Sequence, residues 1–241
     1  MSGQDESHPP SPQIERRLFG RRKGKPLRPS RQKLMDELLP RLRIPRPGEG
    51  EEIDPAALFD FPPKAVWFEV GFGKGEHLAW QAEHNPETGF IGCEPFETGL
   101  AGLCAEIEDR DLHNVRVFED DAALLLAALK PNSLERIFVL FPDPWPKKRH
   151  HKRRFISPSR LDLIARALRD GAELRLGTDH PGYAAWMLRH LLARDDFEWL
   201  AERPADWQVR PADWPPTRYE EKALQEGRKS VYLRFRYRQA A

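Results

Sequence analysis

The sequence predicts an α/β fold, with a mostly parallel sheet that is doubly wound by helices on both faces. Short apolar runs alternate with segments of helical periodicity, as expected of parallel strands joined by crossover helices. A glycine-rich turn, E-V-G-F-G-K-G at residues 69–75, directly follows the first run, where such folds place ligands. The length of 241 residues is enough for one sizeable core and does not require two.

The first part of the chain has a different composition from the rest. Residues 1 to about 30 are rich in proline, serine and arginine, with too little apolar surface to offset the entropy of ordering. Between residues 30 and 42 apolar side chains recur at spacings of three and four, which predicts a short helix. Residues 46–55 are expected to form a linker. We therefore divide the chain into residues 1–55, a mobile basic N-terminal arm with a short helix, and the main domain, residues 56–241.

The main domain contains five strand candidates and five helix candidates. The strands are expected at residues 65–70, 89–94, 115–119, 134–141 and 172–178. The helices are expected at residues 75–85, 96–109, 122–130, 158–170 and 181–194. After Arg228, apolar Val231, Leu233 and Phe235 alternate with other side chains. A period of two indicates a further, late strand.

Charge is unevenly distributed along the chain. The formal net charge is only +1, which taken alone argues against a nucleic-acid partner. However, residues 16–31 contain eight lysines and arginines without an acid, and residues 147–154 contain six. Acidic residues between 49 and 54 balance them. Because a field depends on where the charges lie, we expect two positive patches.

Several classes of protein are disfavoured. No apolar run approaches the roughly 20 residues that span a bilayer, and the polar N-terminus is unlike a signal peptide. Cys93 and Cys104 match neither a disulfide framework nor a metal-ligand spacing. We expect a cytoplasmic protein that binds no membrane and no metal. A monomer is favoured over a homodimer.

The most informative motif is F-P-D-P-W-P-K-K-R-H-H-K-R-R at residues 141–154. Prolines on both sides of Asp143 stiffen its turn and so aim its carboxylate. The basic run that follows repels itself, a cost that phosphates would relieve. Alone, such a run is equally well explained as a solvated face or a localisation signal. Its position beside a rigid Asp143 and Trp145, at the end of an apolar strand, favours contact with nucleic acid.

The glycine turn after the first strand predicts a nucleoside site. Gly71, Gly73 and Gly75 permit positive φ and a close approach of a ligand to the backbone, although a tight strand-to-helix turn needs glycine too. Glu94 ends the next strand 19 residues after Gly75, where a carboxylate reaches ribose hydroxyls. The third glycine comes one residue earlier than in dinucleotide-binding G-x-G-x-x-G. This spacing suits an adenosine cofactor without phosphates.

Asp121 follows the third strand and has two possible roles. It could accept a hydrogen bond from an adenine amino group, or it could cap the helix that follows, and one role does not exclude the other. Together with Glu69 and Glu94 it would give the site an acidic lining. Such a lining favours hydroxyls, amines and a sulfonium over pyrophosphate, so S-adenosylmethionine fits best.

Taken together, these motifs resemble the bacterial tRNA (guanine-N7-)-methyltransferase family. The resemblance also includes T-D-H at residues 178–180 and T-R-Y-E-E-K-A-L-Q-E-G-R-K-S-V-Y-L-R-F at residues 217–235, and it extends over about residues 60–237. It implies the seven-stranded, Rossmann-like methyltransferase variant of the doubly wound sheet. It also implies transfer of the methyl group of S-adenosylmethionine to N7 of guanosine 46 in the tRNA variable loop.

The resemblance further implies roles for individual residues. Cofactor contacts are expected at Glu69, Glu94 and Asp121, beside the glycine turn of Gly71, Gly73 and Gly75. Asp143 would complete the cofactor and guanine pocket and is the catalytic position. Substrate binding is expected at Lys147, Asp179, Thr217, Arg218, Tyr219 and Glu220. RNA contacts are expected at Arg149, His150, His151, Lys152, Arg153 and Arg154.

This chemistry needs no general base. Guanine N7 offers an in-plane lone pair, so the enzyme has to align the two reactants and provide a suitable field. Asp143 could stabilise the positive charge that develops on the base, or it could accept hydrogen bonds from guanine N1 and the amino group. Both roles remain open. Trp145 or Tyr219 could offer a stacking face for the base, and for Trp145 packing beneath the turn is the alternative.

Two other functional classes share part of this pattern. An NAD-dependent oxidoreductase would use the same sheet and a glycine-rich turn, but it would show G-x-G-x-x-G and has no use for the basic run. A non-catalytic RNA-binding module would use the basic blocks, but it does not need Glu69, Glu94 and a glycine cradle.

Overall fold

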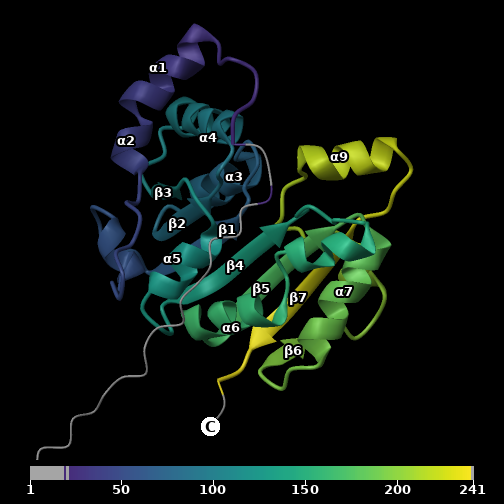
Figure 1. Ribbon diagram of the computed structural model, residues 1–241. Helices are drawn as coiled ribbons and strands as arrows, with labels where there is room; N and C mark the ends of the chain where they lie inside the picture. The colour runs from purple at the N-terminus through teal and green to yellow at the C-terminus, as the bar shows by residue number, and fades with distance from the viewer. Residues whose placement is uncertain (1–18, 20–21, 240–241) are drawn as a thin grey trace, which may run out of the picture.

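The computed structural model describes residue 19 and residues 22–239 (Figure 1). In this part of the chain, seven strands form one sheet in the order β3-β2-β1-β4-β5-β7-β6. The strands are β1 (Ala65–Val70), β2 (Thr88–Cys93), β3 (Val115–Phe118), β4 (Leu134–Leu140), β5 (Leu168–Thr178), β6 (Phe197–Trp199) and β7 (Val231–Tyr237). Neighbouring strands are parallel except that β7 is antiparallel to both β5 and β6. The predicted fold class is confirmed.

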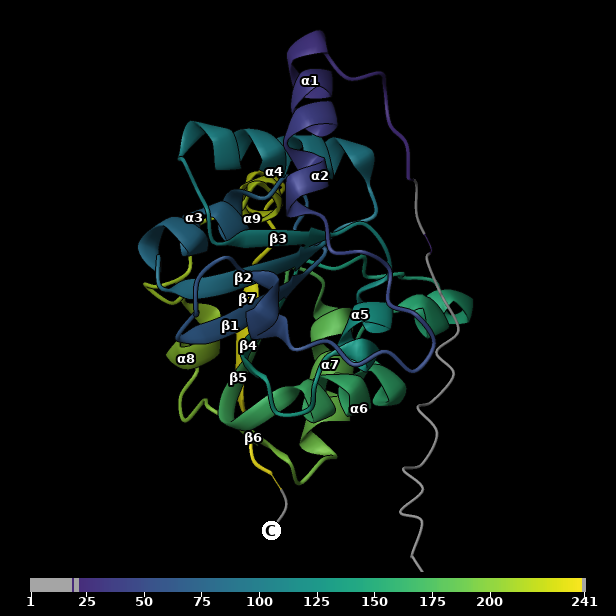
Figure 2. The same cartoon turned by 90° about the vertical axis from the view of Figure 1, so that its left-hand side faces the viewer.

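Helices cover both faces of this sheet (Figures 1 and 2). The helices are α1 (Pro29–Glu37), α2 (Leu39–Leu42), α3 (Glu76–His84), α4 (Glu97–Asp109), α5 (Ala122–Ala128), α6 (Pro158–Ala167), α7 (Pro181–Leu192), α8 (Ala205–Gln208) and α9 (Arg218–Gln225), with 3-10 helices η1 (Pro55–Leu58) and η2 (Lys148–Arg153). The sheet packs against α5, α6 and α7 on one face and against α3 and α4 on the other.

The alternation of side chains along the strands explains why both faces are apolar. In β1, Val66 and Phe68 pack into the cluster with α5, α6 and α7, whereas Trp67 contacts the cluster on the α3 side. In β2, Ile91 packs into the cluster with α5, α6 and α7, and Phe90 packs into the cluster on the α3 side. Successive side chains point to opposite faces, so a parallel strand covered on both sides is apolar along its whole length.

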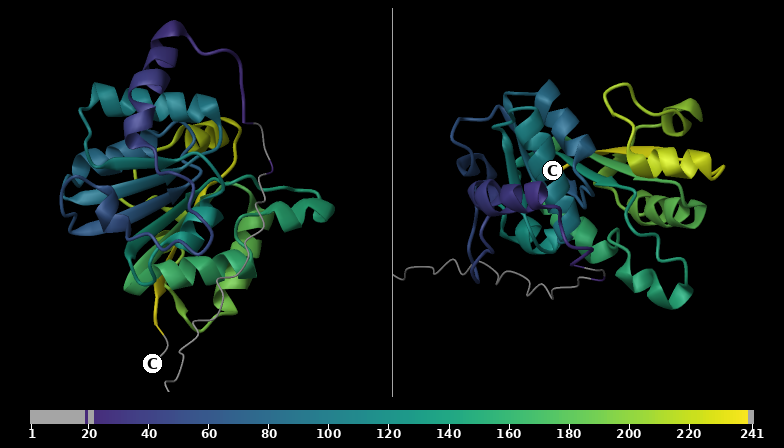
Figure 3. Two further views of the ribbon diagram at one scale, coloured as in Figure 1. Left: turned by 60° about the vertical axis from the view of Figure 1, so that its left-hand side comes forward. Right: turned by 90° about the horizontal axis from the view of Figure 1, so that it is seen from above.

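The described part of the N-terminal region packs on the main domain. Helix α1 lies beside α4 (Figure 3). Helix α2 lies beside β3, and its Leu39 and Leu42 are buried. The predicted helix is therefore present, but it breaks near Pro40, which lacks an amide hydrogen. The expected linker is attached to the main domain through Ile53, whose N–H donates to Ala128 O at the end of α5 over 2.8 Å. We propose that residue 55 separates two regions of different sequence composition. It does not separate two regions that pack independently. Residues 1–18, 20 and 21 of the expected mobile arm lie outside the described residues.

The structure differs from the expected elements at several boundaries. Helix α6 ends at Ala167 and β5 begins at once with Leu168, whereas the sequence predicted a helix to residue 170. Strand β6 and helices α8 and α9 were not predicted from periodicity, because three to eight residues hold too little of a repeat. Cys93 and Cys104 are free and buried. No helix among residues 22–239 is long and apolar enough to cross a membrane.

Candidate functional site

A cavity of about 460 Å³ opens at the carboxyl edge of the sheet. It lies where the strand order reverses between β1 and β4, which is the usual ligand site of a doubly wound sheet. Its volume is typical of a small-molecule site. We call it the edge cavity. Its lining residues are Phe19, Arg22, Val70, Gly71, Gly73, Lys74, Glu94, Pro95, Phe96, Thr98, Gly99, Leu140, Phe141, Pro142, Asp143, Arg218 and Tyr219.

The glycine turn forms one wall of the edge cavity. Gly71, Gly73 and Gly75 have φ values of +69°, +61° and +88°, which side chains disfavour. A β-carbon on Gly71 would meet no atom within 4 Å, so its backbone is open to a ligand. A β-carbon on Gly75 would lie 2.6 Å from Leu103 Cδ1. Gly71 and Gly73 therefore serve the cavity, and Gly75 serves the packing of α3 on α4.

Glu94 follows β2 and is held in a fixed orientation. The N–H of Gly73 donates to Glu94 Oε2 and the N–H of Phe96 donates to Oε1, both over 3.0 Å. Burial raises the pKa of Glu94 to about 7, although these two donors lower it; the nearby Asp143 and Glu69 raise it further. Each oxygen keeps lone-pair capacity for a ligand donor.

Asp143 is presented by a strained turn. The residues two positions before and after it, Phe141 and Trp145, have φ values of +50° and +43°. Bulky side chains rarely adopt this conformation, and it persists only where the surrounding structure enforces it. The N–H of Phe141 donates to Gly177 O over 2.7 Å, which attaches the turn to β5. Partial desolvation raises the pKa of the Asp143 carboxyl.

The basic run begins beside this turn. Its exposed members are Lys147, Lys148, Arg149 and Lys152, and we call them the basic face. Arg153 is half-buried, with its guanidinium 4.9 Å from the Trp145 ring centroid and 5.1 Å from that of Phe19. His150 and His151 are also half-buried. The run therefore presents one charged face to solvent and packs its other side chains on aromatic rings.

Arg154 does not belong to the exposed surface. Its exposed fraction is 4%, and its Nε donates to Pro144 O over 2.8 Å. Its guanidinium lies 4.9 Å from the Tyr183 ring centroid and 5.0 Å from that of Trp186. The expected RNA contact at Arg154 is corrected to a structural role, in which the side chain holds the Asp143 turn onto α7.

Arg154→Ala is expected to destabilise the fold by about 2 kcal/mol, because the part-buried Pro144 carbonyl loses its donor and two rings lose a cation. Arg149→Ala is the control, and a change of less than about 0.5 kcal/mol is expected for this exposed residue. Urea denaturation of the two variants and the parent measures both values. Equal stability of the Arg154 variant and the parent would contradict the structural role.

Glu69 and Asp121 do not line the edge cavity. Glu69 is 2% exposed and lies 2.7 Å, Oε2 to Nδ1, from His77. Asp121 accepts the N–H of Ala123 over 3.1 Å and so caps α5, and it pairs with Arg160 at 2.8 Å. The capping role that the sequence left open for Asp121 is observed. Contact of either carboxylate with a cofactor remains a prediction.

The substrate residues expected on α9 divide into two groups. Arg218 and Tyr219 line the edge cavity, and a β-carbon on Gly73 would lie 3.1 Å from the Tyr219 ring. Thr217 caps α9 by accepting the N–H of Glu220 over 3.2 Å. Glu220 accepts hydrogen bonds from Tyr232 and from Arg210, so it supports the helix from outside the cavity.

The two remaining substrate candidates also lie outside the lining. The carboxylate of Asp179 accepts a hydrogen bond from Arg228 Nε over 2.6 Å. Lys147 is exposed at the start of η2. Their binding of substrate remains a prediction.

Sequence reasoning missed several lining residues. A β-carbon on Gly99 would lie 2.3 Å from Gly73 O, so this glycine lets α4 approach the glycine turn. Its place early in a helix, where glycine is unfavourable, was the available signal. Phe19 and Arg22 also line the cavity, and Arg22 O accepts the N–H of Glu97 over 3.0 Å. The arm had been given no such role.

Comparison with known proteins identifies close relatives. Residues 63–233 match the model of a family described as a putative methyltransferase. The chain is 51% identical to the tRNA (guanine-N(7)-)-methyltransferase of Rhodospirillum rubrum, over 97% of this chain and 92% of the relative. It is 52% identical to the protein of that name from Paramagnetospirillum magneticum, over 92% of this chain and 93% of the relative.

Solved structures share the fold at low sequence identity. The 16S rRNA methyltransferase KamB matches with a TM-score of 0.52 and 16% identity, over 82% of this chain and 99% of that chain. The [4+2]-cyclase SpnF matches with a TM-score of 0.51 and 17% identity, over 74% of this chain and 76% of that chain. Likeness at this level shows the fold alone, which supports more than one chemistry.

The family is therefore decided by the sequence relatives and not by the fold. The family model spans most of the chain, and relatives that are about half identical align with nearly all of it. The chain belongs to the tRNA (guanine-N(7)-)-methyltransferase family.

Proposed function

We propose that this chain transfers the methyl group of S-adenosylmethionine to N7 of guanosine 46 in the variable loop of tRNA. The observation that carries the proposal is the edge cavity, which places Glu94, Asp143 and Tyr219 around one space close to the basic face. The names of the sequence relatives support it. The proposed enzyme acts as a monomer.

The residues of the edge cavity fit S-adenosylmethionine, which supplies an electrophilic methyl group on a sulfonium when it is bound. Gly71 leaves its backbone open, as a cofactor lying against the turn requires. The Glu94 carboxylate is available to accept from ribose hydroxyls. Asp143 and Glu94 line the same cavity and would add negative charge that favours a sulfonium cation.

The side chains of the site would align the base rather than activate it. Asp143 can accept from guanine N1 and the amino group, or stabilise the charge that develops on the base. Tyr219 is 49% exposed and lies beside the glycine turn, so its ring offers a stacking face for a base that has left its own stack.

The basic face is proposed to hold tRNA phosphates. Replacing Lys148, Arg149 and Lys152 with alanine is expected to weaken tRNA binding at moderate salt. The log-log salt slope should become shallower by up to about two or three units, because each phosphate contact contributes roughly one unit on a DNA-like duplex and less on single strands. Cofactor affinity should not change. Filter binding over a salt series measures the slope.

A matched control removes the same number of charges from the opposite edge of the sheet. Lys64, Lys130 and Arg169 precede or begin β1, β4 and β5, so they lie at the amino edge, away from the cavity. Replacing them with alanine should leave the salt slope close to that of the parent. If the two triple variants bind tRNA with the same affinity and the same salt slope, the basic face contacts solvent and does not bind tRNA phosphates.

Methyl transfer from labelled S-adenosylmethionine to unmodified tRNA, followed by nucleoside analysis, tests the proposal. The expected product is 7-methylguanosine, and a tRNA with adenosine at position 46 should give none. Thermal stabilisation by S-adenosylmethionine but not by NAD is expected, because a ligand that binds only the folded state raises its stability. Stabilisation by NAD alone, or tRNA binding without methyl transfer, would overturn the proposal.

A further inference from the structure

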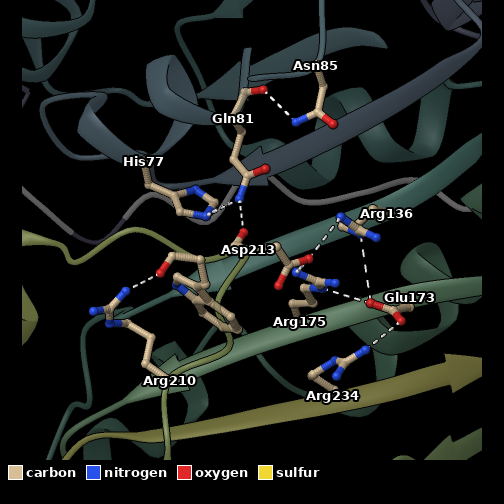
Figure 4. A network of polar contacts seen from close by, with 10 residues as sticks. His77, Gln81, Asn85, Arg136, Glu173, Arg175, Arg210, Asp213 and Arg234 are labelled. Atoms are coloured by element: carbon tan, nitrogen blue, oxygen red, sulfur yellow. Dashed lines mark hydrogen bonds and ion pairs between the residues drawn. The ribbon is translucent and has the colours of Figure 1, made fainter. Parts of the chain in front are cut away.

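Helix α3 connects the two halves of the proposed site. It begins directly after the glycine turn, with Gly75 as its N-cap. Its inner face carries His77 and Gln81, each 2% exposed, and both point toward the residues that precede α9 (Figure 4). Neither side chain lines the edge cavity, and the chemistry proposed above does not use them.

These two side chains belong to a continuous chain of hydrogen bonds. His77 Nδ1 lies 2.7 Å from Glu69 Oε2, and His77 Nε2 lies 3.3 Å from Gln81 Nε2. Gln81 Nε2 also donates to Asp213 O over 2.7 Å. An amide nitrogen can only donate, so Gln81 gives one hydrogen to His77 and the other to the carbonyl. His77 then donates from Nδ1 to Glu69 Oε2.

The far end of this chain holds residues 209–220, which we call the α9 approach. Trp214, in its middle, is completely buried, with its ring centroid 6.1 Å from that of His77. The half-exposed Asp213 carboxylate also forms an ion pair with Arg175 Nη1 at 2.8 Å. Arg175 is itself 2% exposed and bonded to Glu173 at 2.8 Å (Figure 4). Both the carbonyl and the side chain of Asp213 are thus fixed.

These attachments hold helix α9 in position together with the hydrogen bonds that Glu220 accepts from Tyr232 and Arg210. Ala223 is its buried residue, and Leu224 is 75% exposed, so few apolar contacts hold the helix. At its start, Arg218 Nε donates to Glu76 Oε1 over 2.9 Å. Glu76 is the first residue of α3. Helix α3 therefore holds the α9 approach twice, at the part-buried Arg218–Glu76 pair and at the buried Gln81.

We propose that Gln81 is a positioning residue, which His77 and Glu69 orient and which keeps Arg218 and Tyr219 in register with the glycine turn. This inference rests on the proposed function. Because the glycine turn and the Gln81 contact belong to one helix, a methyl donor bound at the turn and a base bound at Tyr219 share one rigid frame. A displacement of about 1 Å between two reactants can cost on the order of 10²-fold in rate.

Gln81→Met tests this role, because it keeps the volume and removes both donors. We expect kcat/KM for tRNA to fall by at least about tenfold, while the Kd of S-adenosylmethionine changes by less than about twofold. Hydrogen exchange at the amides of Trp214 and of residues 217–220 should become faster. The fall in kcat should exceed any rise in KM, since alignment rather than binding is lost.

Asn114→Leu is the matched control. Asn114 is 1% exposed, and its amide nitrogen donates to Ala82 O over 3.0 Å and to Thr88 O over 2.9 Å. The Asn114→Leu variant therefore loses buried hydrogen-bond donors near α3, but it removes no contact of the α9 approach. When its thermal stability falls as much as that of Gln81→Met, the Asn114 variant should keep the activity of the parent. Hydrogen exchange at residues 217–220 should also stay as slow as in the parent. The inference fails if Gln81→Met matches the parent, or if both variants lose activity alike at equal stability.

Glu76→Gln provides a second variant that leaves the core intact. It weakens the part-buried attachment of Arg218, so hydrogen exchange at residues 217–220 should become faster and kcat should fall, as for Gln81→Met. If hydrogen exchange and kcat of the Glu76 variant both match the parent, the inference that α3 holds Arg218 and Tyr219 in register with the glycine turn is overturned, even if Gln81→Met does not fold. If the parent itself does not methylate tRNA, the proposed function fails, whereas the exchange comparison still decides whether α3 anchors the α9 approach.

Discussion

Asp143→Asn is expected to abolish most methyl transfer while the fold stays intact. The shape of the turn depends on the backbone of Phe141 and Trp145 and on the prolines that flank Asp143, none of which change. Asparagine keeps the size of the side chain but removes its charge and one acceptor oxygen. Loss of a group aimed at developing charge costs about 10²–10³ in kcat, and we expect an effect of this order.

Steady-state methylation of unmodified tRNA, with thermal denaturation of the same preparations, measures this effect. Asp60→Asn is the control, because its carboxylate is exposed and lies before β1, where it pairs with Arg116 at 2.8 Å. Near-normal methylation by the Asp143 variant would remove Asp143 from the mechanism. In the parent, protonation of Asp143 should lower activity at acid pH, and its raised pKa moves that loss to a higher pH than for an ordinary aspartate.

A substrate with inosine at position 46 separates the two roles of Asp143. Inosine keeps N7 and lacks the amino group. If Asp143 accepts from that amino group, the parent should methylate inosine more slowly than guanosine, and the Asp143 variant should no longer distinguish them. If Asp143 only stabilises charge, the parent should treat both bases alike. Either result leaves the requirement for the carboxylate intact.

The sheet could be predicted because its strands are buried on both faces. The run Ala65–Val70 is apolar at nearly every position and is bounded by prolines and by the glycine turn, and β1 has these same limits. Glu94 could also be placed, because the end of a parallel strand at the switch point fixes which edge its carboxylate reaches. These inferences need only local pattern and general rules of topology.

The orientation of other charged side chains depends on distant partners. Glu69 occupies the expected position near the end of β1, but whether it faces a ligand or the protein is decided by His77, the second residue of the next helix. Arg154 ends a run of positive charge, and only the rings of Tyr183 and Trp186 on α7 show that it is buried. Sequence spacing contains neither piece of information.

The backbone strain of the Asp143 turn could not be predicted from the sequence, for a related reason. Prolines predicted stiffness, but the left-handed backbone of Phe141 and Trp145 is enforced by contacts such as the hydrogen bond from Phe141 N–H to Gly177 O. Such contacts join segments about 35 residues apart in the chain, so local propensity cannot reveal them. The sequence therefore located the functional turn without its geometry.

Glu94→Ala is expected to weaken S-adenosylmethionine binding by roughly 10- to 150-fold, the equivalent of about 1.5–3 kcal/mol for hydrogen bonds to a charged group. The tRNA affinity should change little, because ribose hydroxyls and not phosphates are the proposed partners. Isothermal titration measures both. Glu97→Ala is the control, since Glu97 begins α4 at the same rim and does not line the edge cavity. Unchanged cofactor affinity in the Glu94 variant would refute the nucleoside-site assignment.

The pH dependence of cofactor binding tests the same residue in the intact site. Burial raises the pKa of Glu94 to about 7, and a hydroxyl donor binds the ionised carboxylate better than the protonated form. Because a ligand that prefers the ionised form must displace the proton below this pKa, affinity should rise between pH 6 and pH 8, by up to about tenfold for a single group. Glu94→Gln cannot ionise, so its affinity should be flat over this range. A parent protein with equally flat affinity would mean that the bound hydroxyls do not use the Glu94 carboxylate, even if the alanine variant binds weakly for structural reasons.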